Sequence, residues 1–111
     1  MLLKDFIAKM EQIAPRSLAL DFDNPGLLIG PERTNIHSVL LALDCTTAVA
    51  REAAEKNVDL VLTHHPLFFH PVKHLLPDDP ETAAAWRLIR HGIGLYAAHT
   101  NLDMARGGVN D

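Results

Sequence analysis

The chain has 111 residues, of which 48% are apolar and 22% charged, and its formal net charge is −4 with neutral histidines. This length suits one domain, and the lack of a basic stripe argues against a nucleic-acid groove. A single cysteine, Cys45, excludes a disulfide framework and favours a reducing, cytoplasmic location. No apolar run approaches the ~20 residues that a membrane-spanning helix needs.

The first thirty residues predict a helix and then a short strand. Residues 2–13 have the apolar spacing of an amphipathic helix, and Pro15 ends it. The apolar positions of this helix are Leu3, Phe6, Ile7, Met10 and Ile13. Within residues 21–30, the turn sequence Asn24-Pro25-Gly26 precedes a short apolar strand.

From Ser38 onward, strands and helices alternate. Residues 39–43 predict a buried strand that stops at Asp44. Thr46 or Thr47 caps a helix that runs to about Lys56. The apolar face of that helix holds Val49, Ala50, Ala53 and Ala54, and Asn57 suits its end.

A second buried strand is expected at residues 58–63, followed by a loop at 64–79 that is rich in histidine and proline. Asp79-Pro80-Glu81 predicts the start of the next helix, and Gly92 its end. The buried side of this helix is expected to hold Ala84, Ala85, Leu88 and Ile89. Residues 93–98 predict a third strand.

This β-α-β-α-β order predicts an α/β fold with a mainly parallel sheet flanked by helices. Right-handed crossovers place the three strand ends on one rim. That rim carries Asp44, then His64-His65, then the segment from His99 to Asp103. We interpret residues 1–111 as a single α/β domain, an amino-terminal fragment of a longer protein and one half of a larger two-part α/β fold.

Histidine is the unusual component, because six of the seven histidines lie between residues 64 and 99. Ligands of open α/β sheets bind beyond the carboxyl ends of the strands, so we expect His64, His65 and Asp103 to bind divalent metal. His99 and Asp44 are expected to orient those ligands or a substrate. The competing interpretations are hydrogen-bonded loop histidines and turn or helix-capping aspartates.

Mixed nitrogen and oxygen ligation suits zinc, manganese, iron or nickel and does not choose among them. Adjacent side chains at a strand end point to opposite sides, so chelation of one ion by both His64 and His65 is awkward. Either two metal ions, or one ligand with a neighbour that orients it, fits the pair better.

Four segments resemble, in the same order, the YbgI-like dinuclear metal-centre proteins, often labelled GTP cyclohydrolase 1 type 2 homologues. They are Asp23-Asn24-Pro25-Gly26-Leu27, Leu43-Asp44-Cys45-Thr46, Thr63-His64-His65-Pro66-Leu67-Phe68-Phe69 and His99-Thr100-Asn101-Leu102-Asp103. The resemblance implies two divalent ions held by His64, His65 and Asp103, a nucleotide-like substrate and a homohexameric ring. It also implies a later histidine and glutamate that this sequence does not contain.

The leading hypothesis is therefore a metal-dependent hydrolase module whose paired metals activate water. The first alternative is a metal-binding scaffold or partner-recruitment protein without turnover. A third is a role in metal storage or sensing.

Overall fold

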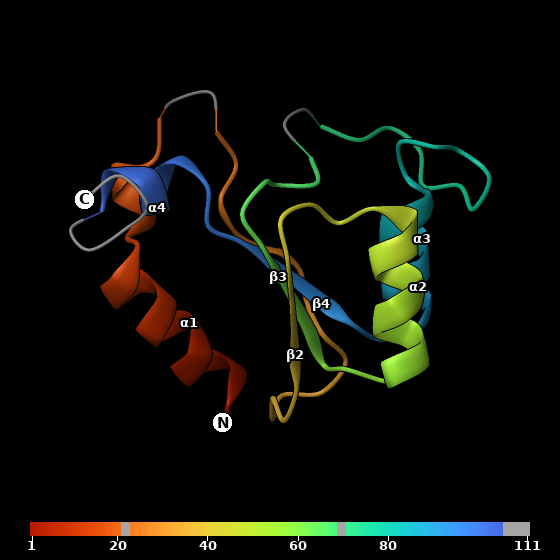
Figure 1. Ribbon diagram of the computed structural model, residues 1–111, viewed down its shortest axis with the longest axis horizontal. Coiled ribbons are helices and arrows are strands. Elements are labelled where there is room, and N and C mark those ends of the chain that lie inside the picture. Colours follow the sequence, from red (N-terminus) through yellow and green to blue (C-terminus); the bar gives the residue numbers. More distant parts are fainter. Residues whose placement is uncertain (21–22, 69–70, 106–111) are drawn as a thin grey trace.

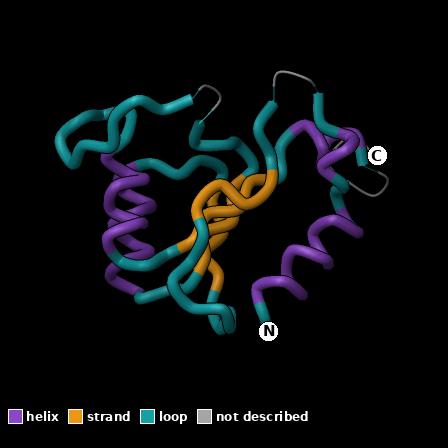
Figure 2. The backbone as a smooth tube through the Cα atoms, turned by 180° about the vertical axis from the view of Figure 1, so that it is seen from behind, coloured by secondary structure: helices purple, strands orange, loops and turns teal. Residues whose placement is uncertain are grey.

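The computed structural model describes residues 1–20, 23–68 and 71–105. A four-stranded sheet lies between two groups of helices, with α1 and α4 on one face and α2 and α3 on the other (Figures 1 and 2). The elements are α1 (Leu3–Ile13), the 3-10 turn η1 (Arg16–Leu18), β1 (Gly26–Ile29), β2 (Val39–Ala42), α2 (Thr47–Lys56), β3 (Leu60–Thr63), α3 (Ala83–Arg90), β4 (Gly94–Ala97) and α4 (Thr100–Met104).

The strand order is β1-β4-β3-β2, in which β2, β3 and β4 run parallel and β1 pairs antiparallel with β4. The predicted α/β class and mainly parallel sheet are thus confirmed. The parallel pairs need crossover connections, which α2 and α3 supply. The carboxyl ends of the three parallel strands consequently lie together on one rim of the sheet, as expected.

The main core lies between the sheet and α2 and α3. Val61 and Leu95 point from β3 and β4 toward Ala53 and Leu88, which are fully buried. A smaller cluster lies under α1, where Phe6 packs edge-on against Tyr96 at 5.9 Å between ring centroids. Helix α1 buries none of its residues completely. It therefore covers only part of its sheet face.

Helix α2 follows its sequence signals closely. The Thr46 hydroxyl accepts a hydrogen bond from the amide of Val49 at 3.1 Å, which identifies Thr46 as the amino-terminal cap. Asn57 ends the helix in the left-handed region with φ 53°, a conformation that asparagine tolerates better than most residues.

Strand β2 differs from its expected burial. Leu41 and Leu43 are 71% and 62% exposed, although residues 39–43 were expected to form a buried strand. The reason is position: β2 is at the edge of the sheet, and α1 does not reach it. The apolar pattern predicted the strand correctly but not its uncovered face.

Helix α3 also begins later than predicted, at Ala83 and not at Pro80. Asp79 accepts a hydrogen bond from the amide of Glu81 at 3.0 Å, which holds this segment in a turn. Ile89 was expected on the buried side but is 51% exposed. Among the residues with described structure, no helix is long and apolar enough to cross a membrane.

Candidate metal centre

Backbone hydrogen bonds tie together the segments that follow the three parallel strands. The amide of His65 donates to the carbonyl of Leu43 at 3.0 Å, and the amide of Ala98 donates to the carbonyl of Thr63 at 2.9 Å. These bonds extend the sheet ladder by one step beyond its last residues. The histidines that follow β3 and β4 therefore leave a rigid edge side by side.

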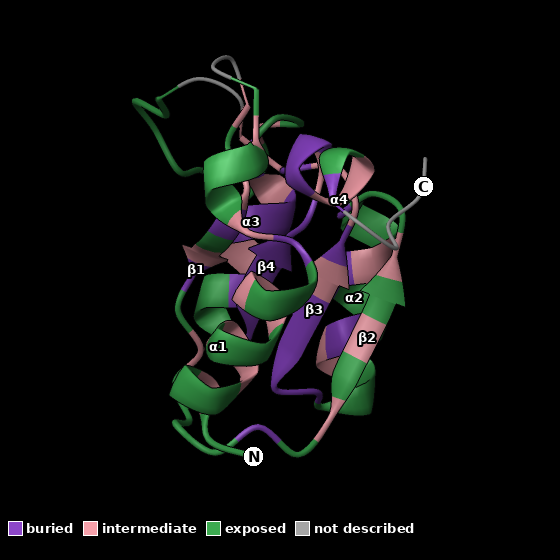
Figure 3. Cartoon of the chain, turned by 90° about the vertical axis from the view of Figure 1, so that its left-hand side faces the viewer, coloured by how far each residue is buried: buried purple, intermediate pink, exposed green. Residues whose placement is uncertain are grey.

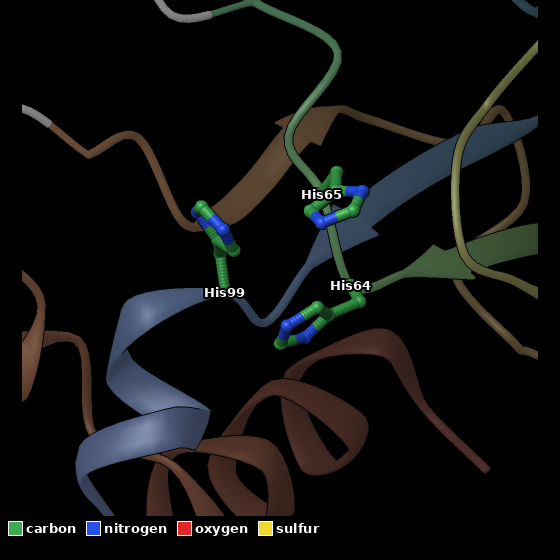
Figure 4. Close-up of side chains that lie close together, drawn as sticks. All are labelled: His64, His65 and His99. Atoms are coloured by element: carbon green, nitrogen blue, oxygen red, sulfur yellow. The ribbon is translucent and has the colours of Figure 1, made fainter. Parts of the chain in front are cut away.

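Three imidazoles gather at this edge (Figure 4). His64, His65 and His99 each offer a ligand atom within 4.8 Å of the others. Their ring centroids are 5.2 Å apart for the adjacent pair and 5.1 Å from His99 to each of the other two. These three residues are called the histidine cluster below. His99 lies as close to His64 and His65 as those two predicted ligands lie to each other.

The rings of His64 and His65 approach each other, contrary to the expectation that they would point to opposite sides. Alternation applies to extended backbone, and the chain bends directly after Thr63. The Thr63 hydroxyl donates to the carbonyl of His65 at 2.9 Å across this bend. One ion shared by both rings is therefore compatible with the backbone.

Every ring of the histidine cluster has an oxygen beside its Nδ1. The Ala98 carbonyl lies 2.7 Å from Nδ1 of His64. Carboxylate oxygens of Asp44 and Asp23 lie 2.7 Å and 3.1 Å from Nδ1 of His65 and His99. Carbonyl and carboxylate oxygens accept, so Nδ1 carries the hydrogen and the lone pair of each neutral ring is on Nε2.

Asp103 reaches the histidine cluster from α4. Its Oδ1 lies 3.5 Å from Nε2 of His64, and both side chains are about three-quarters buried. A carboxylate and the lone pair of a neutral imidazole are both acceptors, so a metal ion or a proton shared between them would stabilise the pair. Two atoms that bind one zinc ion tetrahedrally lie about 3.4 Å apart, and the observed separation fits such an ion.

Asp23 is the component that sequence reasoning did not single out. Its side chain is fully buried and accepts from the amide of Thr100 at 2.9 Å, from the Thr100 hydroxyl and from His99. Burial acts to raise the pKa of Asp23, but these hydrogen bonds, with one from the amide of Asn24, lower it below its ordinary value. Asp23 is therefore a charged anchor for His99.

Helix α4 was also not predicted, and it sets the position of Asp103. Asn101 is fully buried; its side-chain oxygen accepts from the amide of His99 at 2.8 Å, and its nitrogen donates to the carbonyl of Ala14 at 2.8 Å. The Thr100 hydroxyl accepts from the amide of Leu20 at 2.9 Å. Five residues carry too short a pattern to identify a helix held mainly by such long-range bonds.

Asp44 lies beside the histidine cluster, whereas Cys45 and the other described histidines are not part of it. Asp44 is 54% exposed and bonds His65; Thr46 takes the capping role that was the alternative for Asp44. Burial raises the pKa of the Cys45 thiol to about 11, consistent with a small buried residue and not a nucleophile. His74 is exposed in the 64–79 loop, while His70, Phe69 and residues 106–111 lie outside the described residues.

The donor set therefore fits a divalent metal. It consists of neutral imidazoles whose second nitrogens are oriented by oxygens, together with a carboxylate placed against one lone pair. Asp44 and Asp23 lie beside Nδ1 of His65 and His99, the position from which a carboxylate commonly orients a metal-binding histidine.

Comparison with known proteins gives a family match over the whole chain. The profile described as Duf34/NIF3 (NGG1p interacting factor 3) matches residues 1–111. A Clostridium perfringens protein called "GTP cyclohydrolase 1 type 2 homolog" is 46% identical over 111 residues, which are 100% of this chain and 42% of that protein.

Solved structures share the fold. A hypothetical protein from Staphylococcus aureus superposes with a TM-score of 0.90 at 42% identity, over 99% of this chain and 31% of its own. Reduced HcgD from Methanocaldococcus jannaschii gives 0.89 at 36% identity, over 100% of this chain and 44% of its own. The chain thus spans less than half the length of these relatives.

Proposed function

This chain belongs to the Duf34/NIF3 family, and we propose from that premise that its histidine cluster binds divalent metal for a hydrolytic reaction. The observation that carries the proposal is the common arrangement of His64, His65 and His99. Each ring has an oxygen acceptor at Nδ1, which leaves Nε2 free to donate its lone pair to a metal.

We infer that His64, His65 and Asp103 hold two divalent ions, drawn from zinc, manganese, iron and nickel. His99 and Asp44 orient the ligands, and the proximity of His99 to both other rings also suits it to direct ligation. Metal bound in such a site lowers the pKa of a coordinated water and polarises a carbonyl, ring carbon or phosphoryl oxygen of the substrate.

The protein groups contribute orientation and charge. Asp44 fixes the tautomer of His65, and the carbonyl of Ala98 does the same for His64. The half-exposed Asp44 carboxylate at the rim is also available to accept a proton or a substrate hydroxyl hydrogen. Asp44 and the Ala98 carbonyl already occupy these positions in the structure, so the roles need no movement of the rim.

A nucleotide-like substrate is the proposed class. Two observations support this class. The clostridial relative is named "GTP cyclohydrolase 1 type 2 homolog", and the histidine cluster could hold a metal that activates water. We propose further that the protein works as the amino-terminal part of a longer chain, since these relatives are more than twice its length. The resemblance to the YbgI-like proteins supports a homo-oligomer, up to a hexamer.

The test is turnover of a panel of nucleotides by the metal-loaded full-length protein, with product release followed by chromatography. We expect hydrolysis that His64→Ala abolishes and that His91→Ala, an exposed histidine outside the cluster, leaves intact. Metal bound in full with no turnover of any nucleotide would refute the hydrolase part of the proposal.

A second candidate is a metal-binding scaffold that recruits partners without turnover. The observation that favours it is the family description itself, which names an interacting factor. Partner capture that survives removal of the metal, from a protein inactive on every nucleotide, would support the scaffold over the hydrolase.

A further inference from the structure

The side chain of Asn24 reaches across the rim to the segment that follows β3. Its Nδ2 donates a hydrogen bond to the carbonyl of Phe68 at 2.8 Å, although 44 residues separate the two in the chain. A carbonyl oxygen can only accept, so the nitrogen of the amide, and not its oxygen, faces Phe68. Phe68 follows His65 by three positions, so this bond holds the chain where it leaves the histidine cluster.

The bond from Asn24 is the polar attachment of residues 66–68. Within the described part of the chain, no other hydrogen bond reaches this segment. Leu67 and Phe68 are otherwise held by apolar contacts with the main core, against which they are partly buried. Apolar contacts have little directionality, whereas a hydrogen bond constrains both a distance and an angle. The orientation of the segment after His65 therefore depends on Asn24.

Asn24 is itself held in place on both sides. Its backbone amide donates to Oδ1 of Asp23 at 2.8 Å, the same oxygen that lies beside Nδ1 of His99. On the other side, Pro25 restricts the backbone of Asn24 to extended conformations. Gly26, at φ 103°, then begins β1, which pairs with β4. The Asn24 side chain therefore extends from a fixed point of the rim.

Asp23 and Asn24 together contact both segments that carry the histidines. In Figure 4, the chain leading into β1 passes beside His99, and the chain that follows His65 leaves on the other side of the cluster. Asp23 holds His99 in the segment after β4, and Asn24 holds the segment after β3. Strands β3 and β4 are themselves buried along most of their length (Figure 3). A shift of His65 relative to His99 therefore requires one of these two side chains to let go.

We propose that Asn24 is a positioning residue of the candidate metal centre, acting through Phe68 to fix His65 relative to His99 before metal binds. The inference rests on the metal binding proposed above and adds a residue to it, whereas the sequence pattern indicates only a turn at residues 24–26. Ligands that are already in position lose less conformational freedom when the ion binds, so they bind it more tightly. Loss of the Asn24 bond should therefore weaken metal binding and change the coordination geometry without removing a ligand.

The test is the visible absorption of Co²⁺ bound to the full-length protein. This absorption follows the coordination geometry of the ion, so it reports where the ligands lie and not how stable the fold is. Asn24→Asp keeps the shape of the side chain but loses the hydrogen that is donated to Phe68. We expect its Co²⁺ spectrum to differ from that of the wild type. Its Co²⁺ affinity should fall roughly three- to tenfold, less than the loss of a direct partner of a ligand costs.

Two further variants separate the lost bond from added charge and from the substitution itself. Asn24→Ala removes the donor without adding a charge, and it should change the spectrum and the affinity in the same direction as Asn24→Asp. Asn35→Asp is the matched control, because the Asn35 side-chain oxygen accepts from the Met1 ammonium at 3.0 Å and an aspartate keeps that acceptor. This control should have the spectrum and the affinity of the wild type. Circular dichroism checks that all variants are folded.

Hydrogen exchange of the metal-free protein gives a second readout. In both Asn24 variants, a peptide covering residues 64–68 should exchange faster than in the wild type, while a peptide covering α2 should not change. An unchanged Co²⁺ spectrum and affinity in both variants would show that Asn24 only shapes a turn, and would overturn the proposal. A change in Asn24→Asp alone would assign the effect to the added charge and would also overturn it. A wild type that binds no Co²⁺ would instead overturn the proposed metal binding, and this inference with it.

Discussion

Nδ1 of His99 lies 3.1 Å from a carboxylate oxygen of Asp23, although 76 residues separate them in the chain. The same carboxylate holds the amide and the hydroxyl of Thr100 at the start of α4. One buried side chain from the segment before β1 thus positions both a ring of the histidine cluster and the helix that carries Asp103.

Asp23→Asn should therefore weaken the site and the fold together. The amide keeps the shape but loses the charged acceptor for Thr100 and His99, which should cost about 1–3 kcal/mol in the free energy of unfolding. Loss of an orienting partner typically lowers metal affinity by roughly 10–100-fold. Urea denaturation and metal titration measure the two effects, and unchanged values in both would show that the Asp23 contacts contribute nothing.

Cys45 should react slowly with alkylating reagents. Burial raises the pKa of this thiol to about 11, so the reactive thiolate is scarce at neutral pH. We expect labelling by iodoacetamide at pH 8 to be much faster after unfolding in urea than in the native protein. Rapid labelling of the native chain would show that Cys45 is accessible and activated.

Gly94→Ala should destabilise the start of β4. An added Cβ would lie 2.7 Å from Cδ of Pro31 and 2.8 Å from Cδ1 of Leu60, closer than real contacts allow. The expected cost is about 1–3 kcal/mol, typical of overpacking. Gly30→Ala is the control, because nothing lies within 4 Å of its added Cβ. Equal thermal midpoints for the two variants would contradict this account.

The strands, the crossover helices and the shared rim follow from local pattern. Residues 58–63 and 93–98 are mainly apolar, and the strands within them, β3 and β4, are buried along most of their length. The ends of these runs mark where the rim begins. Pairing of His64 with Asp103 could be anticipated because both follow strands whose carboxyl ends must meet.

The rest depends on contacts that local pattern does not contain. Asp23 precedes a turn and carries no periodic signal; its partners come from the far end of the chain. Leu41 has the same local pattern as a buried strand residue, and only the strand order reveals that it lies at an edge. The backbone bend after Thr63 that turns two adjacent rings together is likewise a tertiary outcome.

Metal affinity should fall with acid. Imidazole ligates only when neutral, and its ordinary pKa is ~6.5, so protons compete with the metal increasingly below that pH. We expect bound metal to be released as pH drops through about 6. The release lies below the ordinary pKa of imidazole because the metal competes with protons for the same ring nitrogens. Dialysis at stepped pH with metal analysis measures this. Full retention down to pH 4 would argue against histidine ligation.

Elemental analysis of the purified full-length protein, after incubation with metal, measures whether the histidine cluster and Asp103 bind divalent metal. We predict a stoichiometric content of zinc, manganese, iron or nickel that is lost in His64→Ala, His65→Ala and Asp103→Ala, reduced in His99→Ala, and retained in the control His91→Ala. A folded wild type with no bound metal, or equal metal content in the wild type and all of these variants, would show that these residues do not bind the metal.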